Sequence, residues 1–232
     1  MTDWKIKFIE KIHRVANIYS FRFELPEDLK YKAGQFSYFY IPKEGGGELF
    51  HHFSFSSSPT ESFVEFTTRI RESEYKQTLD KLPIGSIIRM SMVLGQFSLN
   101  PKFDRVAFAC GGIGITAARS NIKWTIDTNA DIDIVLLFAN RHSYHIAFKD
   151  ELESFSGDKF KVFHIISQPE EDWKGSKGRI NVDFITNNVP DCMERKWFVS
   201  GPPEMVDTID KILTKEICVP LEVIREEFFI GY

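Results

Sequence analysis

The chain has 232 residues, of which 43% are hydrophobic and 22 are phenylalanine, and a net charge of −4. This length suits one large domain or two small ones, with a core that needs no disulfide staples. The composition excludes a membrane-spanning helix, a signal peptide, a cysteine framework and an all-cysteine metal or iron–sulfur site, and the slight acidity argues against nucleic acid. Three widely spaced cysteines and no targeting segment favour a cytoplasmic protein.

Short strands dominate the first hundred residues. Aromatic and β-branched runs alternate with turn residues such as Pro26, Gly34 and Pro42, a pattern typical of strands. A short helix is expected over 74–82. Closely spaced strands with few helices favour an antiparallel sandwich or barrel. The expected strands are 4–10, 18–24, 35–41, 63–69 and 87–92.

Strands and helices alternate after Pro101, which predicts βαβ units and a parallel sheet. The change of pattern predicts a first domain over 1–101 and a second over 102–232. The expected strands are 105–110, 133–139, 160–166 and 197–200, and the expected helices are 117–128, 147–154 and 204–214.

A glycine-rich turn, Gly111 to Thr116, follows the first of these strands. Glycines allow close approach of a ligand, and the N-terminus of the following helix offers N–H groups to a phosphate. The spacing G-G-x-G-x-T differs from the Rossmann fingerprint, so a tight turn without a ligand stays an alternative.

Ser200 ends a later strand and is followed by Gly201, Pro202 and Pro203. Open parallel sheets bind ligands at the carboxyl ends of their strands, where Ser200 is expected. The alternative is a helix that begins at the prolines beside an incidental serine.

Adjacent His51 and His52 open a third segment, which continues through Phe53 and Ser54 to a serine run. Neighbours on a strand point to opposite faces, so the histidines would not share a metal ion, and no metal site is expected. Phe53 and Ser54 could present an aromatic face and a hydroxyl to a flat polar ligand. The alternative for the serine run is a plain polar loop.

Together these segments resemble the ferredoxin–NADP⁺ reductase superfamily of FAD-dependent oxidoreductases, over nearly the whole chain and in the same order. The resemblance implies a six-stranded antiparallel β-barrel that binds FAD, followed by a parallel-sheet α/β domain that binds NADPH or NADH. The segments that carry it are the GQF at 34–36, the HHFS at 51–54 with the serine run to Pro59, 68–69 with 73–76, the GQF at 95–97, the turn at 111–116, the SGPP at 200–203, and the EEF and GY of 226–232.

For the first domain, the resemblance implies that Phe53 packs on the isoalloxazine and that Ser54 places its hydroxyl near flavin N5. Arg69 and Lys76 would neutralise the FAD pyrophosphate. Phe228, Phe229 or Tyr232 would cover the other face of the flavin. Further FAD-binding positions are His51, Tyr75, Gln77 and Thr78.

For the second domain, the resemblance implies that Ser200 lies beside the nicotinamide. Glu227 would either relay a proton to Ser54 or form a surface pair. Arg141 or Arg179 could meet the 2′-phosphate of NADPH, or either could be a solvated arginine, so NADPH and NADH both stay open. The positions expected to hold the dinucleotide are Gly111, Gly112, Gly114, Thr116, Gly201 and Pro202.

This sequence departs from the family pattern at three positions. Ala117 replaces a proline, and Ser200 replaces a common cysteine. His51 replaces an arginine, and a neutral imidazole lacks the fixed charge and the fork of arginine. FAD binding would therefore be weaker, pH-sensitive or dependent on Arg69 and Lys76.

The resemblance implies a ferredoxin/flavodoxin–NAD(P)⁺ reductase-like flavoenzyme. Hydride would pass from NAD(P)H to FAD, and electrons would go on to a separate acceptor. That acceptor would be a ferredoxin- or flavodoxin-like protein, another redox subunit or free flavin. Two alternatives are an NAD(P)H:flavin reductase that uses flavin as a substrate, and a non-catalytic flavin- or nucleotide-binding regulatory subunit.

Overall fold

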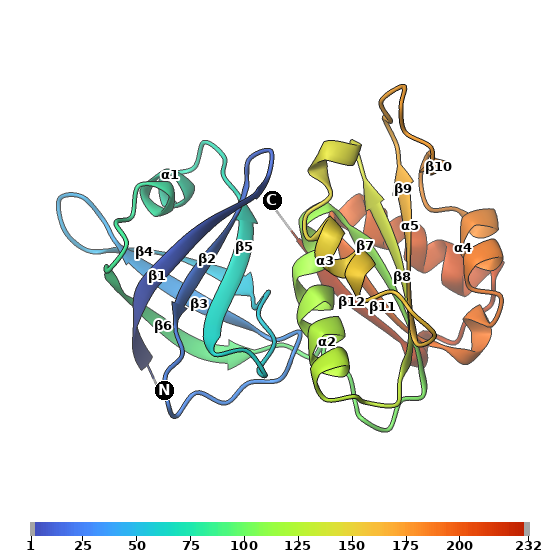
Figure 1. The fold of residues 1–232 in the computed structure, drawn as a ribbon, viewed down its shortest axis with the longest axis horizontal. Helices are drawn as coiled ribbons and strands as arrows, with labels where there is room; N and C mark the ends of the chain where they lie inside the picture. Colours follow the sequence, from blue (N-terminus) through green and yellow to red (C-terminus); the bar gives the residue numbers. More distant parts are fainter. Residues whose placement is uncertain (1–2, 230–232) are drawn as a thin grey trace.

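The computed structural model describes residues 3–229, which form two six-stranded sheets (Figure 1). The first sheet is antiparallel, in the order β4-β3-β6-β1-β2-β5. A bridge between Phe55 and Phe66 joins its two ends, so the sheet curls into a barrel. Its strands are β1 (Asp3–Val15), β2 (Ile18–Glu24), β3 (Phe36–Pro42), β4 (Glu48–Ser54), β5 (Phe63–Arg69) and β6 (Ile87–Leu94).

Phenylalanine rings fill the barrel. Phe21 and Phe23 on β2 are fully buried because alternate side chains of a strand point to one face. Their rings lie 5.5 and 5.6 Å from that of Phe66. The short helix α1 (Glu74–Asp80) adds buried Tyr75 and Leu79 to this core. Much of the phenylalanine excess is therefore explained by packing.

The second sheet is parallel, in the order β10-β9-β8-β7-β11-β12. Its central strands β7 and β8 are apolar between their end residues, because helices cover both faces of the sheet. Helices α2 (Ile115–Asp127) and α3 (Lys149–Ser154) cover the face toward the barrel, and α4 (Val182–Asn188) and α5 (Pro203–Lys211) cover the other (Figure 1). The strands are β7 (Arg105–Gly111), β8 (Asp133–Asn140), β9 (Phe160–Ile166), β10 (Ser176–Lys177), β11 (Lys196–Gly201) and β12 (Ile224–Phe228).

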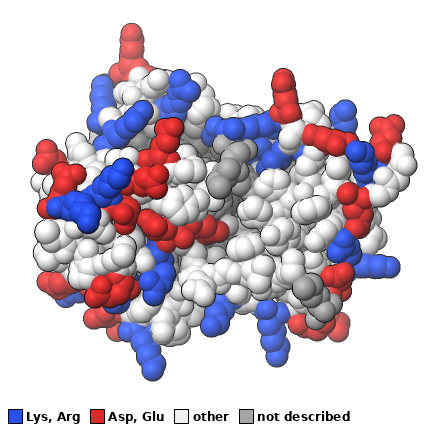
Figure 2. Space-filling view, turned by 180° about the vertical axis from the view of Figure 1, so that it is seen from behind, with Lys and Arg blue, Asp and Glu red and all other residues white. Residues whose placement is uncertain are grey.

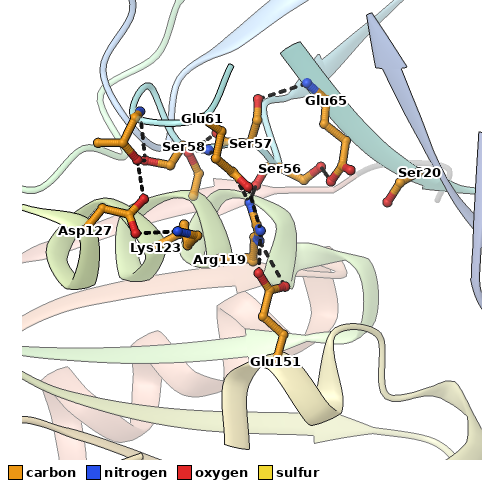
Figure 3. Close-up of polar contacts among 12 residues, drawn as sticks. Ser20, Ser56, Ser57, Ser58, Glu61, Glu65, Arg119, Lys123, Asp127 and Glu151 are labelled. Carbon is orange, nitrogen blue, oxygen red and sulfur yellow. Dashed lines mark hydrogen bonds and ion pairs between the residues drawn. The ribbon is translucent and has the colours of Figure 1, made fainter. Parts of the chain in front are cut away.

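Helix α2 fastens the barrel to the second sheet. Arg119 is 2% exposed and lies between Glu61 of the barrel half and Glu151 of α3, where its guanidinium makes ion pairs with both (Figure 3). The same side chain donates to the Ser56 carbonyl at 2.9 Å. Asn121, two residues further along α2, accepts a hydrogen bond from the Leu99 N–H at 3.0 Å. These bonds hold the two halves at a fixed orientation.

The serine run after β4 is a buried polar network. Ser56, Ser57 and Ser58 are fully buried. The Ser56 hydroxyl donates to Glu65 at 2.8 Å, and the Ser57 hydroxyl accepts from the Glu65 N–H at 2.9 Å (Figure 3). The plain polar loop is therefore wrong for this segment, because the serines are buried and two of their hydroxyls bond the carboxylate and the backbone of Glu65.

The fold class expected from the sequence is confirmed, and the differences concern ends and edges. The helix expected from 147 begins at Lys149, because Phe148 takes a left-handed conformation with φ 60°. The helix expected over 204–214 ends at Lys211 and widens into a π turn over Ile212–Glu216. Helix α4 and strands β4, β10 and β12 were not expected. Within residues 3–229, none of the helices combines the length and apolarity needed to cross a membrane.

Candidate functional site

Ser54 and Glu227 meet where the barrel adjoins the parallel sheet. Ser54 ends β4 and Glu227 lies on the edge strand β12. The Ser54 hydroxyl donates to Glu227 Oε1 at 2.9 Å. The alternative of a surface pair for Glu227 does not fit, because Ser54 is 6% exposed and Glu227 Oε2 is buried. The pair is a defined contact between the two domains.

The Glu227 carboxyl lies in an environment that disfavours its charge. Burial raises its pKa to about 7, although the hydrogen bond from Ser54 lowers it. Its second oxygen, Oε2, has no hydrogen-bond partner within residues 3–229. A carboxyl that titrates near neutrality and bonds a hydroxyl can take up or release a proton at physiological pH. The site is therefore suited to proton transfer at the Ser54 oxygen.

Ser200 lies next to Glu227 in the sheet register, on β11. It is fully buried, and its hydroxyl donates to the Gly114 carbonyl at 2.9 Å. The Cys110 sulfur lies 3.3 Å from the same hydroxyl, and burial raises the pKa of that thiol to about 12. The structure thus uses Ser200 to fix the glycine-rich turn, so its predicted role beside the nicotinamide would be one of positioning.

The glycine-rich turn is built for close approach. Gly112 has φ +52°, a left-handed value that suits glycine. A Cβ on Gly114 would lie 2.6 Å from the Ser200 carbonyl oxygen, so only glycine fits there. Thr116 is buried and donates to the Ile113 carbonyl at 3.1 Å, which stabilises the turn from inside. The side chain of Thr116 therefore faces the turn rather than a ligand.

A cleft of about 430 Å³ opens at the carboxyl ends of the parallel strands. Several residues expected to bind the dinucleotide line it, whereas Gly114, Thr116 and Gly201 are not among its lining residues. Its basic side chains favour an anionic ligand. The lining residues are Arg69, Gly111, Gly112, Ala139, Asn140, Arg141, His145, Ser167, Gly178, Arg179, Ile180, Pro202, Glu204, Met205, Thr208 and Ile209.

Arg69 reaches this cleft from the barrel, although the sequence assigned it to the FAD pyrophosphate. It ends β5 and lines the cleft together with Arg141 and His145. Its Nε is buried and has no hydrogen-bond partner in the described part of the chain. Burial and the charge of Arg71 lower its pKa. A desolvated cation at the wall of a cleft fits an anion there, so this placement favours the dinucleotide over the FAD.

The residues expected around the FAD phosphates gather beside α1. Lys76 is 3% exposed, and its amine donates to Thr68 and lies 4.4 Å from the centre of the Phe53 ring. Burial, reinforced by the charge of Arg71, lowers the Lys76 pKa to about 7. Burial also lowers the pKa of His51 to about 4, which leaves its ring neutral at pH 7. Of these two side chains, Lys76 is the one that can carry a positive charge near pH 7.

The Phe53 ring is covered by neighbouring aromatic rings, so it has little free surface on which a flavin could stack. It is 2% exposed, its ring is parallel to that of Phe66 at 4.3 Å, and the His51 ring stacks at 4.8 Å. Tyr75 is also buried and donates to the Phe39 carbonyl at 3.2 Å. Stacking of a flavin on Phe53 stays a prediction that requires neighbouring side chains to move.

The remaining expected FAD positions are scattered. Gln77 is exposed and donates to the Arg71 carbonyl at 3.0 Å, and Thr78 is partly buried. Phe228 is 42% exposed at the end of β12, whereas Phe229 is 8% exposed and packs in the core of the second domain. Of these rings, only Phe228 is open to a ligand. Tyr232 lies outside the described residues.

The sequence reasoning missed several cleft residues, including Asn140, His145 and Ser167. Asn140 and Ser167 stand at or just after the carboxyl ends of β8 and β9. The apolar runs before them were recognised as parallel strands, so the positions that follow could have been found by the rule already applied to Ser200. Arg119 carried no such signal, because its partners come from distant segments.

The face opposite to that of Figure 1 carries few charges over the barrel half (Figure 2). Outward-facing aromatic side chains of β3 and β4 contribute to the barrel surface. Phe50 is 61% exposed, and its ring lies 6.3 Å from Tyr38 and 5.4 Å from Tyr40. Phe36 pairs with Ser54 in the register. The Ser54–Glu227 site thus borders on an apolar surface.

The chain thus combines a barrel and a parallel α/β sheet, with a polar pair at their junction and a cleft at the strand ends. The family model described as "Oxidoreductase NAD-binding domain" matches residues 108–211. The matched residues lie in the second domain, so this part of the chain is similar to an oxidoreductase NAD-binding domain.

Two curated relatives cover 90% of this chain at 27% identity. They are the glycine betaine monooxygenase reductase subunit of Pseudomonas aeruginosa and NADH-cytochrome b5 reductase 1 of Mortierella alpina. The match spans 59% of the first relative and 73% of the second. This chain is therefore equivalent to only part of the first.

Two solved structures share the fold along nearly their whole length. The cytochrome b5 reductase domain of Ulva prolifera nitrate reductase has a TM-score of 0.83 at 20% identity, with 97% of each chain covered. The ferredoxin NADP⁺ reductase of Neisseria gonorrhoeae has a TM-score of 0.81 at 17% identity, with 97% of this chain and 98% of that chain covered. At such identities the likeness concerns the fold.

Proposed function

We propose that this protein is an FAD-dependent oxidoreductase that accepts hydride from NADPH or NADH and passes electrons to a separate acceptor. The observation that carries the proposal is the hydrogen bond between Ser54 and Glu227, at the junction of the barrel and the strand ends of the parallel sheet. When bound, FAD supplies the redox chemistry, which is the acceptance of hydride and the onward transfer of electrons. The protein supplies binding, orientation and electrostatics.

Ser54 and Glu227 would hold a proton at the point where the reacting rings meet. The raised pKa of Glu227 lets its carboxyl be protonated or ionised near pH 7. The Ser54 hydroxyl can accept a hydrogen bond while it donates to Glu227, so it can connect the carboxyl to a bound ring. A proton could therefore move between Glu227 and the bound ring through the Ser54 hydroxyl, without a water molecule from bulk solvent.

The cleft at the strand ends fits a nicotinamide dinucleotide. Gly111 and Gly112 line its floor, so a pyrophosphate can approach the backbone closely. Arg69, Arg141 and Arg179 supply positive charge around it. Arg141 and Arg179 are exposed, which lets either meet a 2′-phosphate or stay solvated, so NADPH and NADH are both retained as donors.

The buried cation Lys76 fits the phosphates of FAD, since an anion would favour its charged form. The neutral His51 and the covered Phe53 support a second candidate, an NAD(P)H:flavin reductase that binds flavin only as a passing substrate. The two candidates differ in flavin retention. Flavin that stays on the protein through gel filtration supports the first, and flavin that separates supports the second.

The electron acceptor is proposed by class. The relatives are named for a monooxygenase and for cytochrome b5, so an oxygenase component or a cytochrome is the class of partner to test. A ferredoxin- or flavodoxin-like protein, another redox subunit and free flavin stay on the same list. The partner would approach the site formed by Ser54 and Glu227.

An absorbance spectrum of the purified protein, followed by NADH and NADPH titration under argon, tests the proposal. We expect a flavin spectrum that bleaches on titration with one of the two nucleotides. A protein that neither binds added FAD nor consumes NAD(P)H with an artificial acceptor would refute the enzymatic proposal and favour the regulatory subunit.

A further inference from the structure

The Asn140 side chain stands out in the wall of the nucleotide cleft. Asn140 ends β8 and is 6% exposed. Neither its Oδ1 nor its Nδ2 has a hydrogen-bond partner among residues 3–229. It nevertheless lines the cleft, between Ala139 and Arg141. A buried amide with both ends unsatisfied is rare in a native protein and calls for an explanation.

A second buried asparagine shows what a structural amide does in this fold. Asn121 on α2 is fully buried, and its Oδ1 accepts from the Leu99 N–H at 3.0 Å. Its Nδ2 donates to the carbonyls of Phe97 at 2.8 Å and Ala117 at 2.9 Å. The side chain of Asn121 thus links elements of the fold, whereas the side chain of Asn140 makes no hydrogen bond within residues 3–229.

The chemistry of the amide restricts the group that would complete it. An amide has a donor and an acceptor, and turning it over exchanges their places without removing either. A phosphate at neutral pH mainly accepts hydrogen bonds, so it would leave the Asn140 oxygen unmatched. A ribose hydroxyl pair or the edge of an adenine ring both donates and accepts. Either group satisfies the amide completely.

The residues around Asn140 also suggest that charged and neutral side chains bind different parts of the ligand. Arg69 and Arg141 line the cleft and carry the charge that phosphates require. Asn140 lies on β8, between Gly111 at the end of β7 and Ser167 after β9. A dinucleotide that crosses the strand ends would pass this position with its nucleoside parts as well as its phosphates.

We propose that Asn140 is a specificity-determining residue that hydrogen-bonds a nucleoside part of the dinucleotide, through a ribose hydroxyl pair or the adenine edge. The inference rests on the proposed function, because it assigns a residue to the dinucleotide cleft. The inference adds a neutral side chain, which both donates and accepts hydrogen bonds, to the arginines that would bind the dinucleotide in this cleft.

The test compares Asn140→Leu and Asn140→Ala with wild type, in calorimetric titrations of the purified full chain with ADP-ribose, AMP and inorganic pyrophosphate. We expect ADP-ribose to bind at least about fivefold more weakly to both variants, and pyrophosphate to bind equally to all three proteins. A matching loss with AMP places the contact on the adenosine. An AMP affinity that does not change places it on the other ribose.

Thermal unfolding of the free proteins separates a ligand contact from a structural one. Asn140→Leu should keep or raise Tm, because it leaves no partner unsatisfied, whereas the control Asn121→Leu should lower it. An unchanged ADP-ribose affinity, an equal loss for pyrophosphate, or a fall in Tm as large as that of Asn121→Leu would overturn the inference. Wild type that binds none of the three probes would overturn the proposed function and the inference together.

Discussion

Ser54 and Glu227 are 173 residues apart in the chain, and their side chains are joined by a hydrogen bond of 2.9 Å. One residue ends a barrel strand, and the other lies on the last strand of the parallel sheet. The bond therefore exists only when the two domains are docked. It makes the orientation of the domains a condition for the chemistry proposed at their junction.

Ser54→Ala should slow flavin reduction by NAD(P)H at least about tenfold with FAD still bound, because the hydroxyl that connects Glu227 to the reacting ring is removed. Stopped-flow absorbance under argon measures the rate. Ser37→Ala is a matched control, since Ser37 is also buried and donates to the Ser91 carbonyl within the barrel. A rate equal to wild type would remove Ser54 from the mechanism.

Glu227→Gln should change how stability depends on pH. The folded pKa of Glu227 is raised from 4.5 to about 7, so its favourable contribution is complete below pH 4.5 and is lost as the pH rises through 7. Glutamine has no such loss. Relative to wild type, the variant should gain about 2 kcal/mol more at pH 8 than at pH 5.

Urea unfolding of both proteins at the two pH values provides that comparison. The exposed Glu222→Gln serves as the control, and it should show the same difference from wild type at pH 5 and pH 8. If Glu227→Gln behaves like Glu222→Gln, the raised pKa of Glu227 is refuted.

Arg119→Met should lower the free energy of unfolding by about 3 kcal/mol, because it leaves Glu61 and Glu151 facing each other without the buried cation. Chemical denaturation measures the change. Lys123→Ala, which removes a partly exposed pair with Asp127 on the same helix, should cost no more than about 0.5 kcal/mol. Equal effects of the two substitutions would contradict the role of Arg119 as the fastening between the domains.

Gly114→Ala should lower both stability and dinucleotide affinity. The added Cβ would lie 2.6 Å from the Ser200 carbonyl oxygen, so the backbone of the turn or of β11 must shift. A stability loss of about 2 kcal/mol is expected from such overpacking. Gly157→Ala is the control, since its Cβ would meet no atom within 4 Å. Wild-type affinity for NAD(P)H in Gly114→Ala would show that the turn does not shape the site.

Local patterns were enough to find most elements of the fold. The strand at 18–24 and the strand at 160–166 were predicted with the bounds that the structure has, because their apolar residues and turn punctuation lie within the segment. Strand β12 was not found, since its sequence Ile224–Phe228 is mostly charged and becomes a strand by pairing with β11. Its identity as a strand is a tertiary property.

The candidate site shows the same division. Ser54, Glu227 and the glycine-rich turn could be named from the sequence, because their residue types and order match a family pattern. The pattern assigned Arg69 to the FAD phosphates, whereas in the structure it lines the cleft that we propose for the dinucleotide. Which cavity a long side chain enters depends on how the domains dock, and no local spacing contains that information.

The sequence by itself determined the two-domain class, most of the strands and helices, and the residue types at the junction, since each follows from periodicity or from short motifs. Only the tertiary structure decided that Ser54 meets Glu227, that burial raises the Glu227 pKa, and that Asn140 lines a cleft with its buried amide unsatisfied. These properties depend on burial and on distances between remote segments. They arise when the chain has packed, because desolvation and hydrogen bonding are set by neighbours in space.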